Sequence, residues 1–571
     1  MKSVFCVVCF CLLASVPLVG NPATRAGEFS EHGMVSSRSA WASQVGADIL
    51  SQGGNAVDAA VAVGFALAVT YPSAGNLGGG GFMVINLADG TVVTNDHREK
   101  APGKATRDMY LDEDGQVIKG LSTRSHLAVG VPGTVDGLLS VLEKYGTMSR
   151  ADVVTPAIKL ASEGIRLDRD LAGQFKRRLK DFARYPASMA VFSKNGEPYV
   201  QGELFKQPDL AATLKRIRRH GRDGFYKGRT ADLLVAEMQA NDGLISHEDL
   251  QAYQSVWREP VRGRYRGYEI VSMPPPSSGG VLLVQMLNML ESVDLAELGF
   301  GSAAAIHAMI EAERRAYADR AEYLGDPDYF PVPVETLISR EYAAKRFADF
   351  NPKAASRSAD IGAGSIPLES PDTTHASVMD AMGNAVAYTT TLNLSYGAKM
   401  VAAGTGFLLN NEMDDFSAKE NAPNFYGLLG RQANAIEPGK RMLSSMTPTI
   451  VRKDNKPLLA TGSPGGSTII TTTMQVILNI IDHQMGVAEA VASPRFHHQW
   501  MPDRVMIERR AFSPDTLKLL KAMGHENIAE VPSFLGRGIG DANSVMRTEE
   551  GFVGAADPRS AARAVGAAAV R

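Results

Sequence analysis

The stretch that most constrains the fold of this chain is residues 370–393, S-P-D-T-T-H-A-S-V-M-D-A-M-G-N-A-V-A-Y-T-T-T-L-N. Two apolar and β-branched runs, residues 376–380 and 385–391, flank a short connection that contains Gly383 and Asn384. This pattern predicts a tight β-hairpin. Residues 355–372 are rich in Gly, Ser, Ala and Pro, so we expect a mobile loop that runs directly into the first strand.

Thr373 stands where this loop meets the hairpin. If the chain were cut before it, Thr373 would combine a hydroxyl nucleophile with an α-amine, whose reference pKa of about 7.7–8.0 lets it act as a base near neutral pH. A peptide bond in a mobile loop can be cut with little loss of folded structure. From periodicity alone, however, Thr373 and Thr374 are more simply ordinary strand residues.

Composition excludes several classes of function. The 571 residues carry a formal net charge of -3, which lacks the electrostatic footprint of a nucleic-acid binder and favours a small-molecule partner. All three cysteines lie within the N-terminal leader, so the body has no thiol for a disulfide, a zinc site or cysteine catalysis. The adjacent His497 and His498 lack a spaced partner. We therefore expect neither a metal nor a cofactor.

The N-terminus has the layout of a secretory signal peptide. Lys2 precedes an apolar run over residues 4–16, which Pro17 and small residues up to Ala26 follow. The run is shorter than the roughly 20 apolar residues that a spanning helix needs. We expect a signal peptide over residues 1–26, a periplasmic or secreted protein, and no stable membrane span.

Glycine clusters mark two further positions. N-L-G-G-G-G-F at residues 76–82 precedes a predicted strand and lacks the G-K-[ST] of a phosphate loop, so it favours a close backbone crossing. G-S-P-G-G-S at residues 462–467 lies between a predicted strand and an amphipathic helix. The N–H groups of Gly465 and Gly466 could there hold an oxyanion, although a turn needed only for packing is an equal alternative.

Charged residues form two groups. The run at residues 97–100 follows a predicted strand, where binding groups often occur, but a solvated charge run is the simpler interpretation. Residues 307–323 predict a helix with charges at three- and four-residue spacing, which is typical of a salt-linked exposed face. These charges are Glu311, Arg314, Arg315, Asp319 and Arg320.

Eight motifs, taken in order, resemble those of the bacterial γ-glutamyltransferases (γ-glutamyl transpeptidases). Besides the two glycine clusters, they are R-E-K-A-P at residue 98, G-V-P-G-T at 130, D-T-T-H at 372, T-L-N at 391, N-N-E-M-D-D-F-S-A-K at 410 and R-M-L-S-S-M-T-P-T at 441. The resemblance covers nearly all of the chain beyond the leader.

The resemblance implies an α+β fold, the four-layer αββα sandwich of the N-terminal-nucleophile hydrolases. It also implies a precursor that cuts itself between Asp372 and Thr373. The products would be a large subunit of residues 27–372 and a small subunit of residues 373–571, which form a heterodimer around one shared core.

The resemblance further implies a role for each site residue. Thr373 would attack the γ-amide carbonyl of glutathione or another γ-glutamyl donor, with its hydroxyl hydrogen-bonded by Thr391. Gly465 and Gly466 would donate to the oxyanion. The γ-glutamyl ester would then pass to an amino acid, a peptide or water.

The remaining positions would hold and cover the glutamate end of the donor. Its α-carboxylate would bind Arg98, Ser444 and Ser445, and its α-ammonium would bind Asn393, Glu412 and Asp415. Tyr426 matches a lid residue that closes over the bound donor.

Two alternatives compete with the transferase. A cephalosporin-acylase-like amidase would use the same threonine and fold with another acyl donor, and an unprocessed extracytoplasmic binding protein would keep the pocket without catalysis. Asp415 and Tyr426 favour the transferase, because an amidase that acts on dicarboxylic acyl groups has no α-ammonium to pair.

Overall fold

The predicted hairpin is confirmed in the computed structural model, which describes residues 26–362, 373–419, 432–531 and 538–570. Thr373 is the first residue of β10 (Thr373–Asp380), which pairs antiparallel with β11 (Ala385–Thr391). Asp380 closes the turn by accepting hydrogen bonds from the backbone N–H groups of Gly383 and Asn384, at 3.0 and 2.9 Å. The expected mobile loop falls largely on residues 363–372, outside the described residues, and stays a prediction.

The hairpin lies inside a seven-stranded antiparallel sheet, hereafter the first sheet. Its strand order is β19-β2-β10-β11-β3-β4-β7. The other strands are β19 (Arg563–Gly566), β2 (Gly33–Ser37), β3 (Gly80–Asn86), β4 (Val92–His97) and β7 (Val256–Arg258). Strands from both sides of residues 363–372 therefore share one hydrogen-bonded sheet.

A second seven-stranded antiparallel sheet packs against the first. Its order is β1-β18-β17-β13-β12-β9-β8. The strands are β1 (Glu28–Ser30), β18 (Phe552–Ala556), β17 (Asn543–Arg547), β13 (Lys456–Thr461), β12 (Thr449–Lys453), β9 (Tyr268–Ser272) and β8 (Val261–Tyr265). Two small sheets join β14 (Phe496–His497), β15 (Val505–Glu508) and β16 (Ile528–Val531), and β5 (Ile165–Arg166) and β6 (Leu204–Phe205).

Alternation along the strands gives each sheet two apolar faces. In β3, Phe82 and Val84 join the cluster between the sheets, whereas Met83 and Ile85 join the cluster under the helices. In β9, Val271 likewise faces the other sheet. Successive side chains of a strand point to opposite faces, so a strand buried on both sides is apolar throughout.

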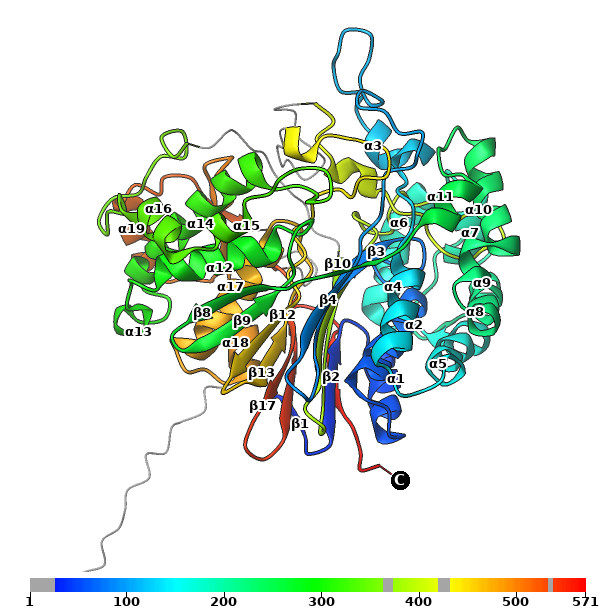
Figure 1. Ribbon diagram of the computed structural model, residues 1–571, viewed down its shortest axis with the longest axis horizontal. Helices are drawn as coiled ribbons and strands as arrows, with labels where there is room; N and C mark the ends of the chain where they lie inside the picture. The colour runs from blue at the N-terminus through cyan, green and yellow to red at the C-terminus, as the bar shows by residue number, and fades with distance from the viewer. Residues whose placement is uncertain (1–25, 363–372, 420–431, 532–537, 571) are drawn as a thin grey trace, which may run out of the picture.

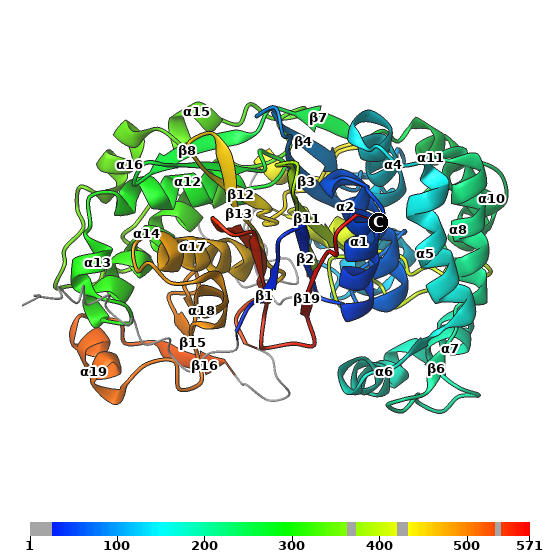
Figure 2. The same ribbon diagram turned by 90° about the horizontal axis from the view of Figure 1, so that it is seen from below.

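Helices cover the outer face of each sheet (Figures 1 and 2). On the first sheet lie α1 (Ala40–Ser51), α2 (Ala56–Thr70) and α4 (Thr134–Tyr145), with α5 (Arg150–Glu163), α8 (Pro208–His220), α9 (Asp223–Tyr226) and α10 (Gly228–Ala240) packed beyond them. On the second lie α12 (Gly279–Leu290), α14 (Ala303–Tyr323), α17 (Thr468–Ile481) and α18 (Val487–Ala492).

The remaining helices range from four to 14 residues. They are α3 (Leu121–Arg124), α6 (Arg169–Phe182), α7 (Pro186–Phe192), α11 (His247–Ala252), α13 (Leu295–Leu298), α15 (Val334–Leu337), α16 (Arg340–Phe347) and α19 (Pro514–Ala522), with the 3-10 helices η1 (His126–Ala128), η2 (Glu412–Asp415) and η3 (Gln432–Asn434). Within the described ranges, no helix is long and apolar enough to cross a bilayer.

The predicted exposed face of α14 is wrong. Its charged residues Glu311, Arg314, Arg315, Asp319 and Arg320 are all buried. The Nη1 atom of Arg315 lies 2.6 Å from Oε2 of Glu311, so the charges satisfy one another inside the protein. Residues four apart can form an ion pair on an exposed helix and on a buried helix alike, so the spacing does not reveal burial. The helix α14 is buried because it packs against α12, α16 and α19.

Arg315→Ala tests this buried ion pair. We expect the free energy of unfolding to fall by about 3–5 kcal/mol, because Glu311 would lose its nearest cation while it stays buried. Arg357→Ala is the control, since Arg357 is exposed and its pair with Asp360 spans 3.8 Å; its effect should stay within about 0.5 kcal/mol. Denaturant unfolding measures both, and equal losses would contradict the assignment.

Candidate active site

Thr373 and Thr391 face each other at the open end of the hairpin. Their Cα atoms are register partners, and Oγ1 of Thr373 donates to Oγ1 of Thr391 at 3.5 Å. The backbone N–H of Asn393 donates to Thr391 Oγ1 at 2.9 Å, which orients that hydroxyl. The hairpin therefore places a hydroxyl beside Thr373, where the resemblance puts the partner of the nucleophile.

Gly465 and Gly466 lie between β13 and α17, as the sequence predicts. Both have positive φ, +140° and +58°, a region that glycine enters at little cost. A Cβ on Gly465 would lie 2.3 Å from Thr468 Oγ1, so a larger residue does not fit without a rearrangement. The turn presents its backbone at the N-terminus of α17, the end of a helix that attracts negative charge.

Buried side chains hold the residue after this glycine pair. The hydroxyl of Tyr317 donates to the carbonyl of Ser467, and the Ser467 hydroxyl donates to Gln499 Oε1 at 2.7 Å. His497 contacts Ser467 Oγ through Nε2 at 3.2 Å and Thr471 Oγ1 through Nδ1 at 2.9 Å. His497 thus orients the start of α17, a role that its sequence context did not indicate.

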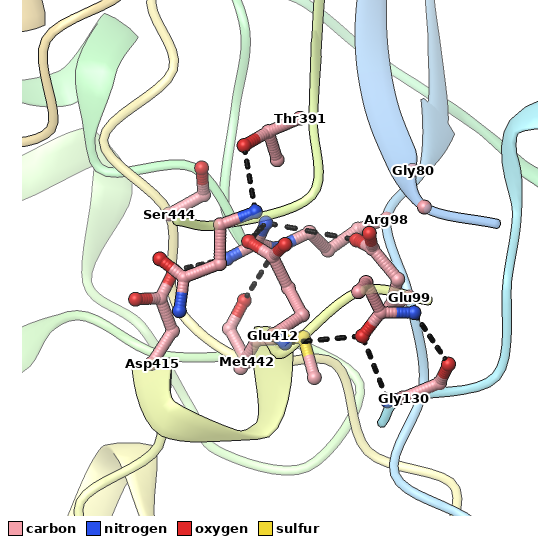
Figure 3. Close-up of polar contacts among 12 residues, drawn as sticks. Gly80, Arg98, Glu99, Gly130, Thr391, Glu412, Asp415, Met442 and Ser444 are labelled. Carbon is pink, nitrogen blue, oxygen red and sulfur yellow. Dashed lines mark hydrogen bonds and ion pairs between the residues drawn. The ribbon is translucent and has the colours of Figure 1, made fainter. Parts of the chain in front are cut away.

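Arg98 follows β4 and is buried, so the interpretation of residues 97–100 as a solvated charge run is wrong. Its guanidinium forms ion pairs with Glu412 and Asp415 at the two ends of η2 (Figure 3). It also donates to the carbonyl oxygens of Met442 and Leu443, both at 3.3 Å. Tertiary contacts therefore satisfy the charge, which explains why it can leave the solvent.

Arg98, Glu412 and Asp415 change one another's pKa values. Burial disfavours charged Arg98, but the attraction of Glu412 and Asp415 outweighs burial and raises the pKa of Arg98. Burial also raises the pKa of Glu412 and of Asp415 above the usual range, against the attraction of Arg98. Arg320 of α14 also attracts Asp415, so two guanidinium groups act on the carboxylates of this cluster.

Ser444 and Ser445 lie on the segment before β12. The N–H and hydroxyl of Ser278 both donate to the Ser444 carbonyl at 2.7 Å, which fixes the backbone there. Arg320 of α14 donates to Ser445 Oγ at 3.0 Å. Sequence reasoning missed this second arginine because its helical spacing was interpreted as an exposed face.

One cavity brings most of the predicted residues together. It is lined by Arg98, Thr373, Thr391, Asn393, Glu412, Asp415, Ser444, Ser445 and Gly466, and also by Met446 and Ile469, which sequence reasoning did not single out. We call this cavity the donor pocket, after the donor that the resemblance implies. Asp372 and Tyr426 lie outside the described residues, so the predicted cut and lid stay predictions.

A possible metal-ligand group lies elsewhere. His307, Glu311 and His525 place three ligand atoms within 4.8 Å of one another, and none of them lines the donor pocket. Nδ1 of His307 and Nε2 of His525 are 2.8 Å apart in a hydrogen bond. Glu311 forms ion pairs with Arg314 and Arg315. These ligand atoms already have partners, and two guanidinium groups beside them oppose a metal cation.

Comparison with known proteins agrees with the geometry. A family model described as Gamma-glutamyltranspeptidase matches residues 42–567. The chain is 52% identical to the glutathione hydrolase proenzyme of Escherichia coli (strain K12), over 93% of this chain and 91% of that protein.

Two solved structures share the fold. Cephalosporin acylase from Bacillus halodurans has a TM-score of 0.83 at 26% identity, covering 96% of this chain and 98% of that chain. Gamma-glutamyltranspeptidase from Helicobacter pylori has a TM-score of 0.56 at 46% identity, covering 61% of this chain and 97% of that chain.

Thr391→Val tests the Thr391 hydroxyl, which accepts a hydrogen bond from the backbone N–H of Asn393. The side chain keeps its shape but leaves the buried N–H of Asn393 without this acceptor, so we expect a loss of about 1–3 kcal/mol in the free energy of unfolding. Thr391→Ser is the control, because it keeps the hydroxyl. If the valine and serine variants unfold at the same denaturant concentration, the hydroxyl has no such role.

Proposed function

We propose that this chain, which belongs to the gamma-glutamyltranspeptidase family, is a self-processing glutathione hydrolase and γ-glutamyltransferase. The observation that carries the proposal is the donor pocket, which joins Thr373 to a buried cluster of Arg98, Glu412 and Asp415. A hydroxyl nucleophile next to one cation and two anions is complementary to an amide whose acyl end is an amino-acid zwitterion.

We assign the fold to the four-layer αββα sandwich of the N-terminal-nucleophile hydrolases. The large subunit would be residues 27–372 and the small subunit residues 373–571. Support comes from the sheets, because the first sheet takes β2, β3, β4 and β7 from one subunit and β10, β11 and β19 from the other. Interleaved strands would keep the heterodimer together after the cut.

Processing would begin with the Thr373 hydroxyl attacking the carbonyl carbon of Asp372. The hydroxyl proton passes to the amide nitrogen, the C–N bond breaks, and Asp372 becomes an ester on Thr373. Water then hydrolyses the ester, which leaves a carboxylate on Asp372 and a free α-amine and hydroxyl on Thr373. That α-amine supplies the base of the mature site.

In the mature enzyme, Thr373 Oγ1 would attack the γ-amide carbonyl of glutathione or a related donor, and its α-amine would take the proton. The N–H groups of Gly465 and Gly466 would stabilise the oxyanion. The α-amine then passes that proton to the leaving nitrogen as the C–N bond breaks, which releases the amine and leaves a γ-glutamyl ester on Thr373. An amino acid, a peptide or water would then take the acyl group and restore the hydroxyl.

The donor's glutamate end would exchange ion pairs within the buried cluster. Its α-carboxylate would bind Arg98, Ser444 and Ser445, and its α-ammonium would bind Glu412 and Asp415 with the side chain or carbonyl of Asn393. The donor carboxylate becomes a new partner of Arg98, and the donor ammonium becomes a new partner of Glu412 and Asp415. Few buried charges therefore stay unpaired. Such exchange favours an acyl group that carries both an ammonium and a carboxylate.

The rival is an amidase like the cephalosporin acylase that shares the fold. A dicarboxylic acyl donor would supply a carboxylate for Arg98 but no cation for Glu412 and Asp415. Glu412 and Asp415 would then stay buried while Arg98 pairs in part with the donor carboxylate, and leaving buried carboxylates without a full partner costs free energy. The donor pocket therefore favours a γ-glutamyl donor.

Two further parts of the proposal concern residues that lie almost wholly outside the described ranges. Residues 1–26 would be a signal peptide that directs the enzyme to the periplasm or the medium. Tyr426 would cover the bound donor and limit the access of water to the ester. The site itself would need no metal and no cofactor, since the nucleophile, the base and the oxyanion donors all belong to the chain.

Self-processing can be tested by electrophoresis and N-terminal sequencing. Purified wild type should give two bands, the smaller beginning at Thr373, and Thr373→Ala should stay one chain because its nucleophile is missing. Thr374→Ala is the control and should process, since within the described residues Thr374 Oγ1 has no hydrogen-bond partner. An uncut, inactive wild type would support the binding-protein alternative.

Donor selectivity separates the transferase from the amidase. A γ-glutamyl anilide and a glutaryl anilide differ only by the α-ammonium, so wild type should prefer the former. Asp415→Asn should lower kcat/KM for the γ-glutamyl anilide by about 30- to 3,000-fold, the range for losing one partner of a buried charge pair. The glutaryl anilide should lose far less, and equal losses would refute the ammonium assignment.

A further inference from the structure

Tyr317 of α14 is a buried phenol that the proposed mechanism does not use. Its hydroxyl donates a hydrogen bond to the carbonyl oxygen of Ser467, which follows Gly466 and is the N-cap of α17. Tyr317 precedes residues 363–372 in the chain and Ser467 follows them. The contact would therefore join the proposed large subunit to the turn that is proposed to hold the oxyanion.

Hydrogen bonds at the start of α17 set the direction of the Gly466 N–H. The carbonyl oxygens of Gly465 and Gly466 accept from the backbone N–H groups of the first two residues of α17, at 3.1 and 3.2 Å. In a trans peptide the C=O and the next N–H point in opposite directions, so the N–H groups of Gly466 and Ser467 point away from α17. Gly466 lines the donor pocket together with Thr373. The aim of its N–H thus depends on how firmly the peptide units up to Ser467 are held.

The side chain of Ser467 has anchors of its own. Its hydroxyl donates to Gln499 Oε1, and Gln499 Nε2 donates to the Met501 carbonyl at 3.4 Å, which places the amide oxygen toward Ser467. Burial lowers the pKa of His497 to about 3, so the imidazole is neutral near pH 7. A proton on Nε2 of His497 satisfies its contacts with Ser467 and Gln499, while Nδ1 accepts from the Thr471 hydroxyl at 2.9 Å.

The helix α14 also holds the segment that carries these anchors. Glu313 lies one helical turn before Tyr317, on the same face of α14. Its Oε2 accepts from the backbone N–H of His498 at 2.8 Å. The ring of Tyr317 meets the ring of His497 edge-on, with centroids 5.6 Å apart and an interplanar angle of 85°. One face of α14 therefore contacts both the turn and the side chains that anchor it.

We propose that Tyr317 is a positioning residue of the oxyanion site, whose hydroxyl fixes the Ser467 carbonyl and so keeps the Gly466 N–H directed at the carbonyl oxygen of the γ-glutamyl group. This inference rests on the proposed function of the donor pocket. Tyr317 is not among the residues that line the pocket, and it acts only through the turn. Donors that are fixed before the reaction stabilise an oxyanion better than donors that must reorganise, so losing the hydroxyl should slow the reaction.

Tyr317→Phe removes the hydroxyl and keeps the ring, so it tests this role with a γ-glutamyl anilide. We expect kcat per processed chain to fall by about 10- to 100-fold, below the roughly 100- to 1,000-fold cost of removing an oxyanion donor itself. KM should stay within about two-fold of wild type, because the lost stabilisation belongs to the transition state. The ratio of transfer to hydrolysis should not change, since an amine and water attack the same ester carbonyl.

Tyr226→Phe is the matched control. Tyr226 is also buried and donates to a backbone carbonyl, that of Pro132, at 2.9 Å, but it does not line the donor pocket. Thermal unfolding should show a loss of stability in both phenylalanine variants, whereas only Tyr317→Phe should lose kcat. Equal kcat values for Tyr317→Phe and wild type, or equal losses of kcat in the two variants, would overturn the positioning role.

Ser467→Ala examines the same turn without changing Tyr317. It keeps the carbonyl that Tyr317 binds but removes the hydroxyl contacts with Gln499 and His497, so kcat should again fall while KM stays near the wild-type value. If Tyr317→Phe fails to fold, an unchanged kcat in Ser467→Ala would overturn the inference, because the turn would need no buried anchor. An inactive wild type would instead refute the proposed function and this inference with it.

Discussion

The pairing of β10 with β11 is the constraint on which the site depends. Seven consecutive register pairs, from Thr373 with Thr391 to Met379 with Ala385, join the two strands. On its other side β10 pairs with β2 only from Ala376 onward, so the first three residues are held from one side. Thr373 is thereby fixed in the sheet while one edge beside it stays available for the pocket.

The pocket is built from charges that the protein buries together. Arg98, Glu412 and Asp415 are each costly to bury alone, and each is tolerated because the others neutralise it. The same principle explains α14, where Glu311 and Arg315 pair inside the second helical region. Among the side chains that line the pocket, the carboxylates of Glu412 and Asp415 face the guanidinium of Arg98, and Arg320 of α14 reaches Ser445 beside them. This arrangement supports the proposed recognition of a donor that has an ammonium group.

The sheets also explain how the chain would stay folded after the proposed cut before Thr373. Both sheets interleave strands from before and after residues 363–372, and the apolar layer between them includes Phe82 from one side and Met379 from the other. Separating the two parts would expose that layer and break the strand pairing. The proposed cut of one peptide bond before Thr373 would remove neither interaction.

The sequence by itself determined the local structure around Thr373, the proposed nucleophile. Strand and turn residues predicted the hairpin and the turn at Gly465 because such signals depend on neighbours in the chain. Choosing Thr373 among the threonines, and the fold class, required the resemblance to a family. Only the tertiary structure decided that residues 97–99 and the charges of α14 are buried, and that Arg320 reaches Ser445. Burial and partner choice depend on segments hundreds of residues apart, whereas helical spacing is the same in water and in a core.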